Sequence, residues 1–513
     1  MSGDAGRDRR DRGAAGDHRR DAGGRQRGEA RAQGRAGRTT AAPAQRARHG
    51  DAARGAAFDT LRAVADSDAY ANLVLPPMLR ERGIVGRDAG FATELAYGTL
   101  RLRGRYDAVL AQASARALGQ VDPPVLDVLR LGAHQLLGMR VAPHAAVSET
   151  VGLARERVGA GAAQFVNAVL RRVAERPLDE WLERVGEAAD PQGSDPLARL
   201  AVTESHPAWV VRALRESLVG AGRSADELAE LLAADNAAPR VTLVARPGLA
   251  SPDEVAEQSG AEPTGLSSTA LVLPGGDPGA VPAVRDGRAG VQDEGSQLVT
   301  LAFAAVPVEG TDARWLDLCA GPGGKAALLG ALAAQRGARL VANELAPHRA
   351  RLVEQALRAV PGAAVEEVRT GDGRSVGALE PGAYDRVLLD APCTGLGALR
   401  RRPEARWRRT PADLATLSAL QRELLVSALA AVRPGGVVGY VTCSPHLAET
   451  QLVVLDALRA AGRAGTTAQV VDAVPVMAQV APSWVPVAGR ADVQLWPHVH
   501  GTDAMHLTLL RRV

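Results

Sequence analysis

The chain has 513 residues, 46% of them hydrophobic and 23% charged, which is ordinary for a soluble globular protein of about three domains. It has no run of 18 apolar residues and no apolar segment near its start, so we expect neither a transmembrane helix nor a secretory signal. Three cysteines are too few to cross-link so long a chain, which excludes a disulfide scaffold and favours a cytoplasmic location.

Positive charge is concentrated at the N-terminus. Residues 1–50 hold 13 Arg against six acidic residues, a net charge of +7, whereas the whole chain carries +3. This segment has no Val, Ile, Leu, Phe, Tyr, Trp or Cys, so residues 1–54 are expected to form a disordered tail. The tail is either a non-specific RNA-binding arm or a solvated, dispensable extension.

A single lysine, Lys325, occurs among the 61 basic residues. Arg has a broad planar fork and Lys a compact ammonium on a slim stem, so a lysine in such a chain can mark a position that Arg cannot fill. The alternative is that this one lysine was retained by chance.

Residues 55–176 show helical apolar spacing and almost no alternating β-branched runs, which predicts an all-α domain. Pro123 and Pro124 are placed to open one of its helices. Residues 177–202 are rich in charge, Pro and Gly, which predicts a linker. Residues 203–290 mix short helical and strand patterns, with a strand at 240–245, and predict a small α/β region.

Residues 291–513 alternate short apolar runs with amphipathic stretches, which predicts a doubly wound α/β sheet. The expected parallel strands lie at 315–318, 340–343, 386–389 and 437–441. A long helix is expected after Thr410, because Thr410, Pro411 and Asp413 supply an N-cap, a proline at the first position and an acid at the third.

The distinctive residues follow the strand ends, where such sheets bind ligands. The first strand leads into Cys319-Ala320-Gly321-Pro322-Gly323-Gly324-Lys325, in which glycines allow close approach of a ligand and a helix N-terminus follows. Glu344 lies 23 residues after Gly321, a distance at which an acid can bind ribose hydroxyls. Asp372 and Asp390 follow later strands.

All three cysteines lie in these loops. Cys319 is expected to pack or line a cofactor. Cys393 and Cys443, next to turn residues at strand ends, are expected to do chemistry. The sequence lacks a Cys-x-x-Cys pair, so no metal site is predicted.

Two sets of sequence motifs resemble those of known families. Arg87-Asp88, Glu94-Leu-Ala-Tyr-Gly98, Leu129-Arg-Leu-Gly-Ala-His-Gln135 and Phe165-Val-Asn-Ala-Val-Leu-Arg-Arg172 together resemble a NusB-like RNA-binding domain. Asp317-Leu-Cys-Ala-Gly-Pro-Gly-Gly-Lys325, Asp390-Ala-Pro-Cys-Thr-Gly395 and Thr442-Cys-Ser444 resemble the Sun-type family of RNA cytosine-C5 methyltransferases. The order of the domains narrows the resemblance to members that act on 16S ribosomal RNA.

The resemblance implies S-adenosylmethionine (SAM) bound by residues 319–325, Glu344, Asp372 and Asp390. It implies Cys443 as the nucleophile that adds to C6 of the cytosine and Cys393 as the residue that aids release. Asp390 is expected to contact the base edge near N3, and Lys325 to orient or polarise the base. The implied partner is 16S rRNA or a small-subunit assembly intermediate, and a cytoplasmic monomer without metal or membrane is expected.

The family often has Ser at Thr394 and Asp at Glu344, replacements that keep the chemistry, whereas the 203–290 region departs more and leaves its RNA contacts open. The run 400–409 holds six Arg and Trp407, and we expect it to contact RNA.

Three other functions remain open on the residues alone. Gly321, Gly323 and Ala326 also satisfy the pattern of a dinucleotide oxidoreductase, although this reading does not explain Cys393 and Cys443. The front domain and tail would suit a non-enzymatic RNA-binding or ribosome-assembly factor. A DNA cytosine methyltransferase shares the chemistry, but its nucleophile follows a proline, whereas Cys443 follows Thr442.

Overall fold

The computed structural model describes residues 51–67 and 69–513. The predicted tail therefore lies outside the described residues, apart from its last few positions. Those positions begin helix α1 (Ala52–Asp66), for which the Asp51 carboxylate accepts a hydrogen bond from the Arg54 amide at 3.0 Å. The helix starts earlier than the sequence suggested because Asp51 is an N-cap.

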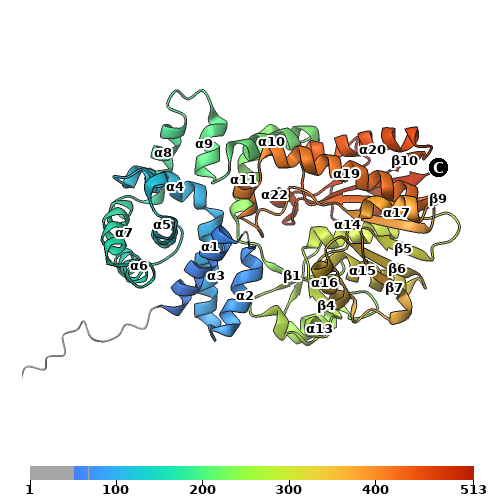
Figure 1. Cartoon of the computed structure of the whole chain (residues 1–513), viewed down its shortest axis with the longest axis horizontal. Coiled ribbons are helices and arrows are strands. Elements are labelled where there is room, and N and C mark those ends of the chain that lie inside the picture. The colour runs from blue at the N-terminus through green and yellow to red at the C-terminus, as the bar shows by residue number, and fades with distance from the viewer. Residues whose placement is uncertain (1–50, 68) are drawn as a thin grey trace, which may run out of the picture. The chain divides into compact units, whose positions relative to one another are not determined.

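The predicted all-α domain is present and is coloured blue to cyan in Figure 1. Its core includes Leu95, Val128, Leu129 and Val166, which are fully buried. Pro123 opens α5, as predicted. The helices of this domain are α1, α2 (Ala71–Glu81), α3 (Gly86–Arg101), α4 (Arg103–Ala113), α5 (Pro123–Leu137), α6 (Pro143–Arg157) and α7 (Ala160–Val173).

The segment 177–202 was expected to be a linker, but it forms helices α8 (Leu178–Ala189) and α9 (Pro196–Thr203). The reason is an apolar pair one helical turn apart. Trp181 and Val185 are buried against the helical domain, and the Trp181 indole donates to the carbonyl of Val173 at 3.0 Å. The surrounding charged residues concealed this pair from sequence reasoning.

A small α/β region follows, as predicted. Helices α10 (Ala208–Gly220) and α11 (Leu228–Asn236) precede an antiparallel sheet of order β2-β3-β1-β4. The other elements are β1 (Val241–Ala245), α12 (Pro252–Ser259), β2 (Glu262–Pro263), β3 (Ala270–Leu273), α13 (Pro282–Arg285) and β4 (Ala289–Val291).

The larger sheet has the order β10-β12-β9-β8-β5-β6-β7, with β11 beside β12. All predicted parallel strands are present. They are β5 (Arg314–Asp317), β6 (Arg339–Glu344), β8 (Tyr384–Asp390) and β9 (Val432–Thr442), joined by β7 (Val365–Thr370) at one edge. Beyond β9 the sheet is antiparallel through β10 (Ala468–Val471), β11 (Val493–Gln494) and β12 (His506–Arg512). The sheet is therefore mixed, which the sequence did not predict.

Helices cover both faces of this sheet (Figure 1). One face carries α14 (Glu294–Ala305), α15 (Gly324–Gln335), α16 (Pro347–Leu357) and α21 (Val474–Val480). The other carries α17 (Gly373–Leu379), α19 (Pro411–Ala431) and α20 (Gln451–Arg463), while α18 (Ala405–Arg408) and α22 (Pro497–His500) are short helices in loops. Alternation along β5 explains the two layers, because Trp315 packs on the first face and Leu316 on the second.

Helix α19 begins after Thr410 as predicted, and the Thr410 amide donates to the Asp413 carboxylate at 2.8 Å. Its length and composition would allow it to cross a membrane. Leu424, Leu425 and Leu429 are buried against the sheet, which is the packing of a core helix.

Candidate active site

The loops after β8 and β9 bring Cys393 and Cys443 together. The two strands are parallel neighbours with Asp390 opposite Val441, so the loops leave the same edge of the sheet. The two sulfur atoms are 3.3 Å apart, within hydrogen-bonding distance, and both side chains are partly buried. Residues separated by 50 positions in the sequence therefore form one thiol pair.

The two thiols differ in acidity. The hydrogen bond from Cys393 lowers the pKa of Cys443, and the positive charges of Lys325 and Arg402 act in the same direction. The same hydrogen bond and burial raise the pKa of Cys393 well above its usual value, and Glu449 and Asp390 add to this effect. Cys443 is thus the thiol that ionises first, with Cys393 as its hydrogen-bond donor.

Lys325 and Asp390 form an ion pair beside these thiols. The Lys325 Nζ lies 2.8 Å from Asp390 Oδ2, and the two side chains are 12% and 27% exposed. Burial opposes the charge on Lys325, but Asp390 outweighs it, so the pKa of Lys325 is raised and the ammonium stays charged. Lys325 is in the first turn of α15, and Asp390 ends β8.

A buried carboxylate that sequence reasoning missed holds the Cys393 loop. Glu449 is fully buried, and its Oε1 accepts hydrogen bonds from the Thr394 amide at 2.7 Å and from Gln421 Nε2 at 3.1 Å. Its Oε2 accepts from the Thr394 hydroxyl, and Gln421 also donates to the carbonyl of Pro392 at 2.8 Å. The residues on both sides of Cys393 are therefore fixed to α19 and to the segment after β9.

Gly397 joins the two cysteine loops through the backbone. Its amide donates to the carbonyl of Cys443 at 2.9 Å, and its carbonyl accepts from the Ala504 amide at 2.8 Å. A Cβ at this position would lie 2.2 Å from the carbonyl oxygen of Ala504. A side chain at Gly397 would therefore push the two loops apart.

The glycine loop 319–325 lies between β5 and α15, as predicted. The Gly321 amide donates to Glu344 Oε2 at 3.0 Å, and the Gly321 carbonyl accepts from Arg349 at 2.5 Å. A Cβ on Gly321 would lie 2.3 Å from the Glu344 carboxylate, and one on Gly323 would lie 2.6 Å from Ala356 Cβ. Gly323 also has a φ of 109°, which favours glycine.

Asp317, at the end of β5, is an isolated buried carboxylate. The side chain is fully buried, neither of its oxygens has a side-chain partner among the described residues, and the Cys319 amide is the one backbone donor near enough to lower its pKa. Burial raises the pKa of Asp317 to about 8, and the negative charge of Asp390 contributes. The sequence motif includes Asp317, yet sequence reasoning gave it no role, because its isolation exists only in the folded chain.

Cys319 and Asp372 stand outside the central cluster. The Cys319 side chain packs in the hydrophobic layer that covers the second face of the sheet, and burial raises its pKa well above the usual value. Asp372 caps α17 and pairs with Arg374, with 2.7 Å between the Arg374 nitrogen and Asp372 Oδ2. Cys319 is therefore no nucleophile in this structure, and the Asp372 carboxylate is engaged by its own loop.

Most of the arginine run 400–409 makes contacts within the protein. Arg406 is fully buried and donates to the carbonyls of Arg101 and Ser205 at 3.2 and 3.0 Å. The Trp407 indole nitrogen is buried and a Cβ on Gly104 would overlap its ring. The expectation that the run contacts RNA is wrong for Arg406, because tertiary packing buries this side chain completely, whereas the Trp407 side chain is only partly buried.

Comparisons with known proteins identify the family of the chain. A family model described as "16S rRNA methyltransferase RsmB/F" matches residues 305–511, and one described as "NusB family" matches residues 51–175. A Mycobacterium tuberculosis (strain H37Rv) protein named as a methyltransferase is 53% identical over 466 residues, covering 90% of this chain and 97% of its own.

The ribosomal RNA small subunit methyltransferase B of Pseudomonas putida is 33% identical over 407 residues, covering 78% of this chain and 87% of its own. Among solved structures, a protein named PH0851 superposes with a TM-score of 0.72 at 19% identity, covering 90% of this chain and 98% of that one. This last likeness concerns the fold.

Proposed function

Because the chain belongs to the RsmB/F family of 16S rRNA methyltransferases and carries a NusB-family domain, it is a SAM-dependent RNA methyltransferase, and we propose that it methylates C5 of a cytosine in 16S rRNA. Family membership decides against a dinucleotide oxidoreductase and against a non-enzymatic assembly factor. The observation that carries the proposal is the thiol pair Cys393–Cys443, with sulfur atoms 3.3 Å apart and pKa values moved in opposite directions.

The residues at the glycine loop fit SAM. The amides that begin α15 suit the carboxylate of its methionine part, and the unpartnered Asp317 carboxylate suits an ammonium group. Glu344, at the end of β6, can accept hydrogen bonds from ribose hydroxyls, and the 67% exposed Leu345 beside it offers an apolar surface for a base. Asp372 lies at the same edge of the sheet. SAM supplies the methyl group as an electrophilic sulfonium.

The reaction needs a nucleophile because C5 of cytosine attacks poorly. In our proposal, the Cys443 thiolate adds to C6, and C5 becomes the nucleophilic carbon of an enamine. The lowered pKa of Cys443 favours the thiolate that this step requires. Asp390 accepts a hydrogen bond from the exocyclic N4 amino group of the cytosine, beside N3, and Lys325 holds Asp390 in place through their 2.8 Å contact.

Cys393 completes the reaction. Once Cys443 is bonded to C6, it is no longer a thiolate and no longer accepts the hydrogen bond from Cys393. The largest cause of the raised Cys393 pKa is thereby removed. Cys393 then gives its proton to solvent water and, as a thiolate, takes the proton from C5. The electrons of the C5–H bond restore the C5=C6 double bond and expel Cys443 as a thiolate.

We propose that the protein acts as a monomer in the cytoplasm, on 16S rRNA or a small-subunit assembly intermediate; the thiol pair, Lys325 and Asp390 come from one chain and need no residue from a second copy. The target base must leave its stack to reach these groups, so an RNA loop or an opened duplex is the substrate. The NusB-family domain is the natural docking module for that RNA.

The test is transfer of labelled methyl from SAM to 16S rRNA, with mass spectrometry of the product nucleoside. Wild-type protein should form 5-methylcytosine. Cys443→Ala should abolish transfer, and Cys393→Ala should accumulate a covalent protein–RNA adduct. Arg463→Ala, at the exposed C-terminal end of α20, serves as the surface control.

Failure of wild-type protein to methylate free 16S rRNA and assembly intermediates, despite SAM binding, would refute the rRNA assignment. Transfer that survives Cys443→Ala would refute the nucleophile. An adduct in Cys443→Ala rather than in Cys393→Ala would exchange the two roles.

A further inference from the structure

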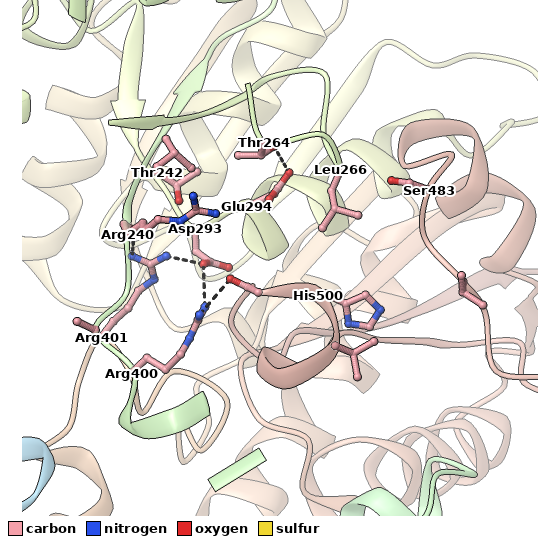
Figure 2. Close-up of a pocket in the computed structure, with 15 residues that line it drawn as sticks. Arg240, Thr242, Thr264, Leu266, Asp293, Glu294, Arg400, Arg401, Ser483 and His500 are labelled. Atoms are coloured by element: carbon pink, nitrogen blue, oxygen red, sulfur yellow. Dashed lines mark hydrogen bonds and ion pairs between the residues drawn. The ribbon is translucent and has the colours of Figure 1, made fainter. Parts of the chain in front are cut away.

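A cavity of about 440 Å³ lies beside the catalytic loops, between β1 of the small sheet and the loops around α22 (Figure 2). Its volume falls within the range of roughly 300–1,000 Å³ that is typical of small-ligand sites. None of the residues assigned above to SAM or to the thiol chemistry lines it. Arg400 and Arg401, from the arginine run that was expected to contact RNA, lie in its wall.

The wall that the cavity shares with the catalytic loops is rigid. Arg401 contacts Asp293 at 2.7 Å and Arg400 contacts Asp503 at 3.2 Å, so both arginines are held by buried acids. The same loop reaches Cys443 through the 2.9 Å hydrogen bond from the Gly397 amide. A group bound in the cavity would therefore lie next to the segment that fixes the reactive thiols.

Hydrogen-bonding groups without protein partners line the cavity. The Arg240 guanidinium is exposed and makes no ion pair or hydrogen bond with any residue of 51–67 or 69–513, and the Thr242 hydroxyl likewise has no partner there. His500 Nδ1 lies 2.9 Å from the Trp496 amide nitrogen and 3.3 Å from the Trp496 carbonyl oxygen, whereas its Nε2 has no hydrogen-bond partner among the described residues. Burial lowers the pKa of His500 to about 4, which keeps the ring neutral.

Apolar side chains face these polar groups. Val485 is 76% exposed and Val499 45% exposed, which is unusual for valine, and Leu266 lies near them. Figure 2 shows Arg240 and Thr242 on one side of the cavity and Leu266 and His500 on the other. A nucleotide matches this lining. Its flat base can pack against the apolar wall, its phosphate can pair with the arginine, and the polar groups at the edge of the base can bond to the neutral polar side chains.

We propose that this cavity binds one unstacked nucleotide of the RNA that flanks the target cytosine. The base lies against Leu266, Val485 and Val499, the Arg240 guanidinium binds its phosphate, and the Thr242 hydroxyl and His500 Nε2 form hydrogen bonds with the base edge. A paired base in a duplex stays stacked, so the occupant is a nucleotide of a single-stranded stretch. This inference rests on the proposed function, because it takes the RNA substrate as given.

The experiment uses full-length protein and a 16S rRNA fragment in which each nucleotide around the methylated position is replaced in turn by 4-thiouridine. After irradiation, peptide mapping should place the cross-link of one flanking position within 483–485 or 499–501. Val485→Trp, which fills the cavity from an exposed position, should remove this cross-link.

Arg240→Ala should raise KM for the RNA about ten-fold with little change in kcat, because it removes binding energy that substrate and transition state share. Arg240→Lys should restore part of the affinity, and Arg463→Ala should behave as wild type.

Cross-links that fall only outside the cavity, while methylation proceeds, would overturn the inference. So would an unchanged KM in both Arg240→Ala and Val485→Trp. Cross-linking to the cavity peptides without any methyl transfer would instead refute the proposed reaction and leave the nucleotide site standing.

Discussion

Replacement of Lys325 by methionine removes the positive charge beside Asp390 and keeps an unbranched side chain that is one atom shorter. The ammonium and the carboxylate are 2.8 Å apart, which at an effective dielectric constant of about 20 corresponds to an attraction of about 6 kcal/mol. Desolvation of the two groups offsets part of this energy. Since Asp390 is 27% exposed and regains some hydration, we expect Lys325→Met to lose about 3 kcal/mol of stability, measured by urea unfolding.

The same replacement should impair the nucleophile. Lys325 lowers the pKa of Cys443, and Asp390, which raises it, would lose its partner. The pKa of Cys443 should therefore rise. Alkylation by iodoacetamide at a series of pH values, followed by mass spectrometry of the Cys443 peptide, reports this pKa without RNA. The midpoint should move to higher pH, and methyl transfer at neutral pH should fall by about 10²–10³-fold.

Two variants sharpen this test. Lys325→Arg keeps the charge but enlarges the head group inside a buried turn, so it should also lose activity. Lys325→Met/Asp390→Asn removes both charges and should return the Cys443 midpoint toward the wild-type value. An unchanged or lower midpoint in Lys325→Met would refute the argument that Lys325 stabilises the thiolate.

Three further outcomes are expected. Glu449→Gln places an amide donor where Thr394 and Gln421 donate, so it should lower the free energy of urea unfolding by about 2–4 kcal/mol. Because Glu449 fixes the Cys393 loop, the variant should also retain the RNA adduct much as Cys393→Ala does, and rapid resolution of the adduct would contradict this. Gly397→Ala, combined with Cys393→Ala, should abolish the adduct that Cys393→Ala alone accumulates in a denaturing gel-shift assay, because the Cβ meets the carbonyl of Ala504. The pKa of Asp317 is about 8 in the folded protein and about 4 in the unfolded chain, so without SAM its contribution to stability is lost as pH rises from about 4 to 8. Asp317→Asn should remove that loss from the urea midpoints measured over a series of pH values.

The main elements of the fold could be predicted because the sequence patterns that indicate strands and helices are local. Period-two and period-3.6 apolar patterns follow from the geometry of the strand and the helix, so β5, β6, β8, β9 and the start of α19 could be placed from the residues alone. Sequence reasoning failed at 177–202, where Trp181 and Val185 pack against a distant part of the chain. It also failed at the antiparallel edge, since the direction of β12 depends on long-range pairing with β9.

The same division applies to the site. The sequence by itself placed Cys393, Cys443, Lys325 and Asp390 at strand ends, because parallel strands end at one edge of a sheet. Only the tertiary structure decided that the two sulfur atoms touch and that Cys443 is the more acidic, because a pKa depends on the charges that folding brings near. Folding likewise buried Arg406, isolated Asp317 and engaged Glu449, none of which a linear pattern records. Composition and spacing thus determine which groups are available, whereas burial and long-range contact decide what each of them can do.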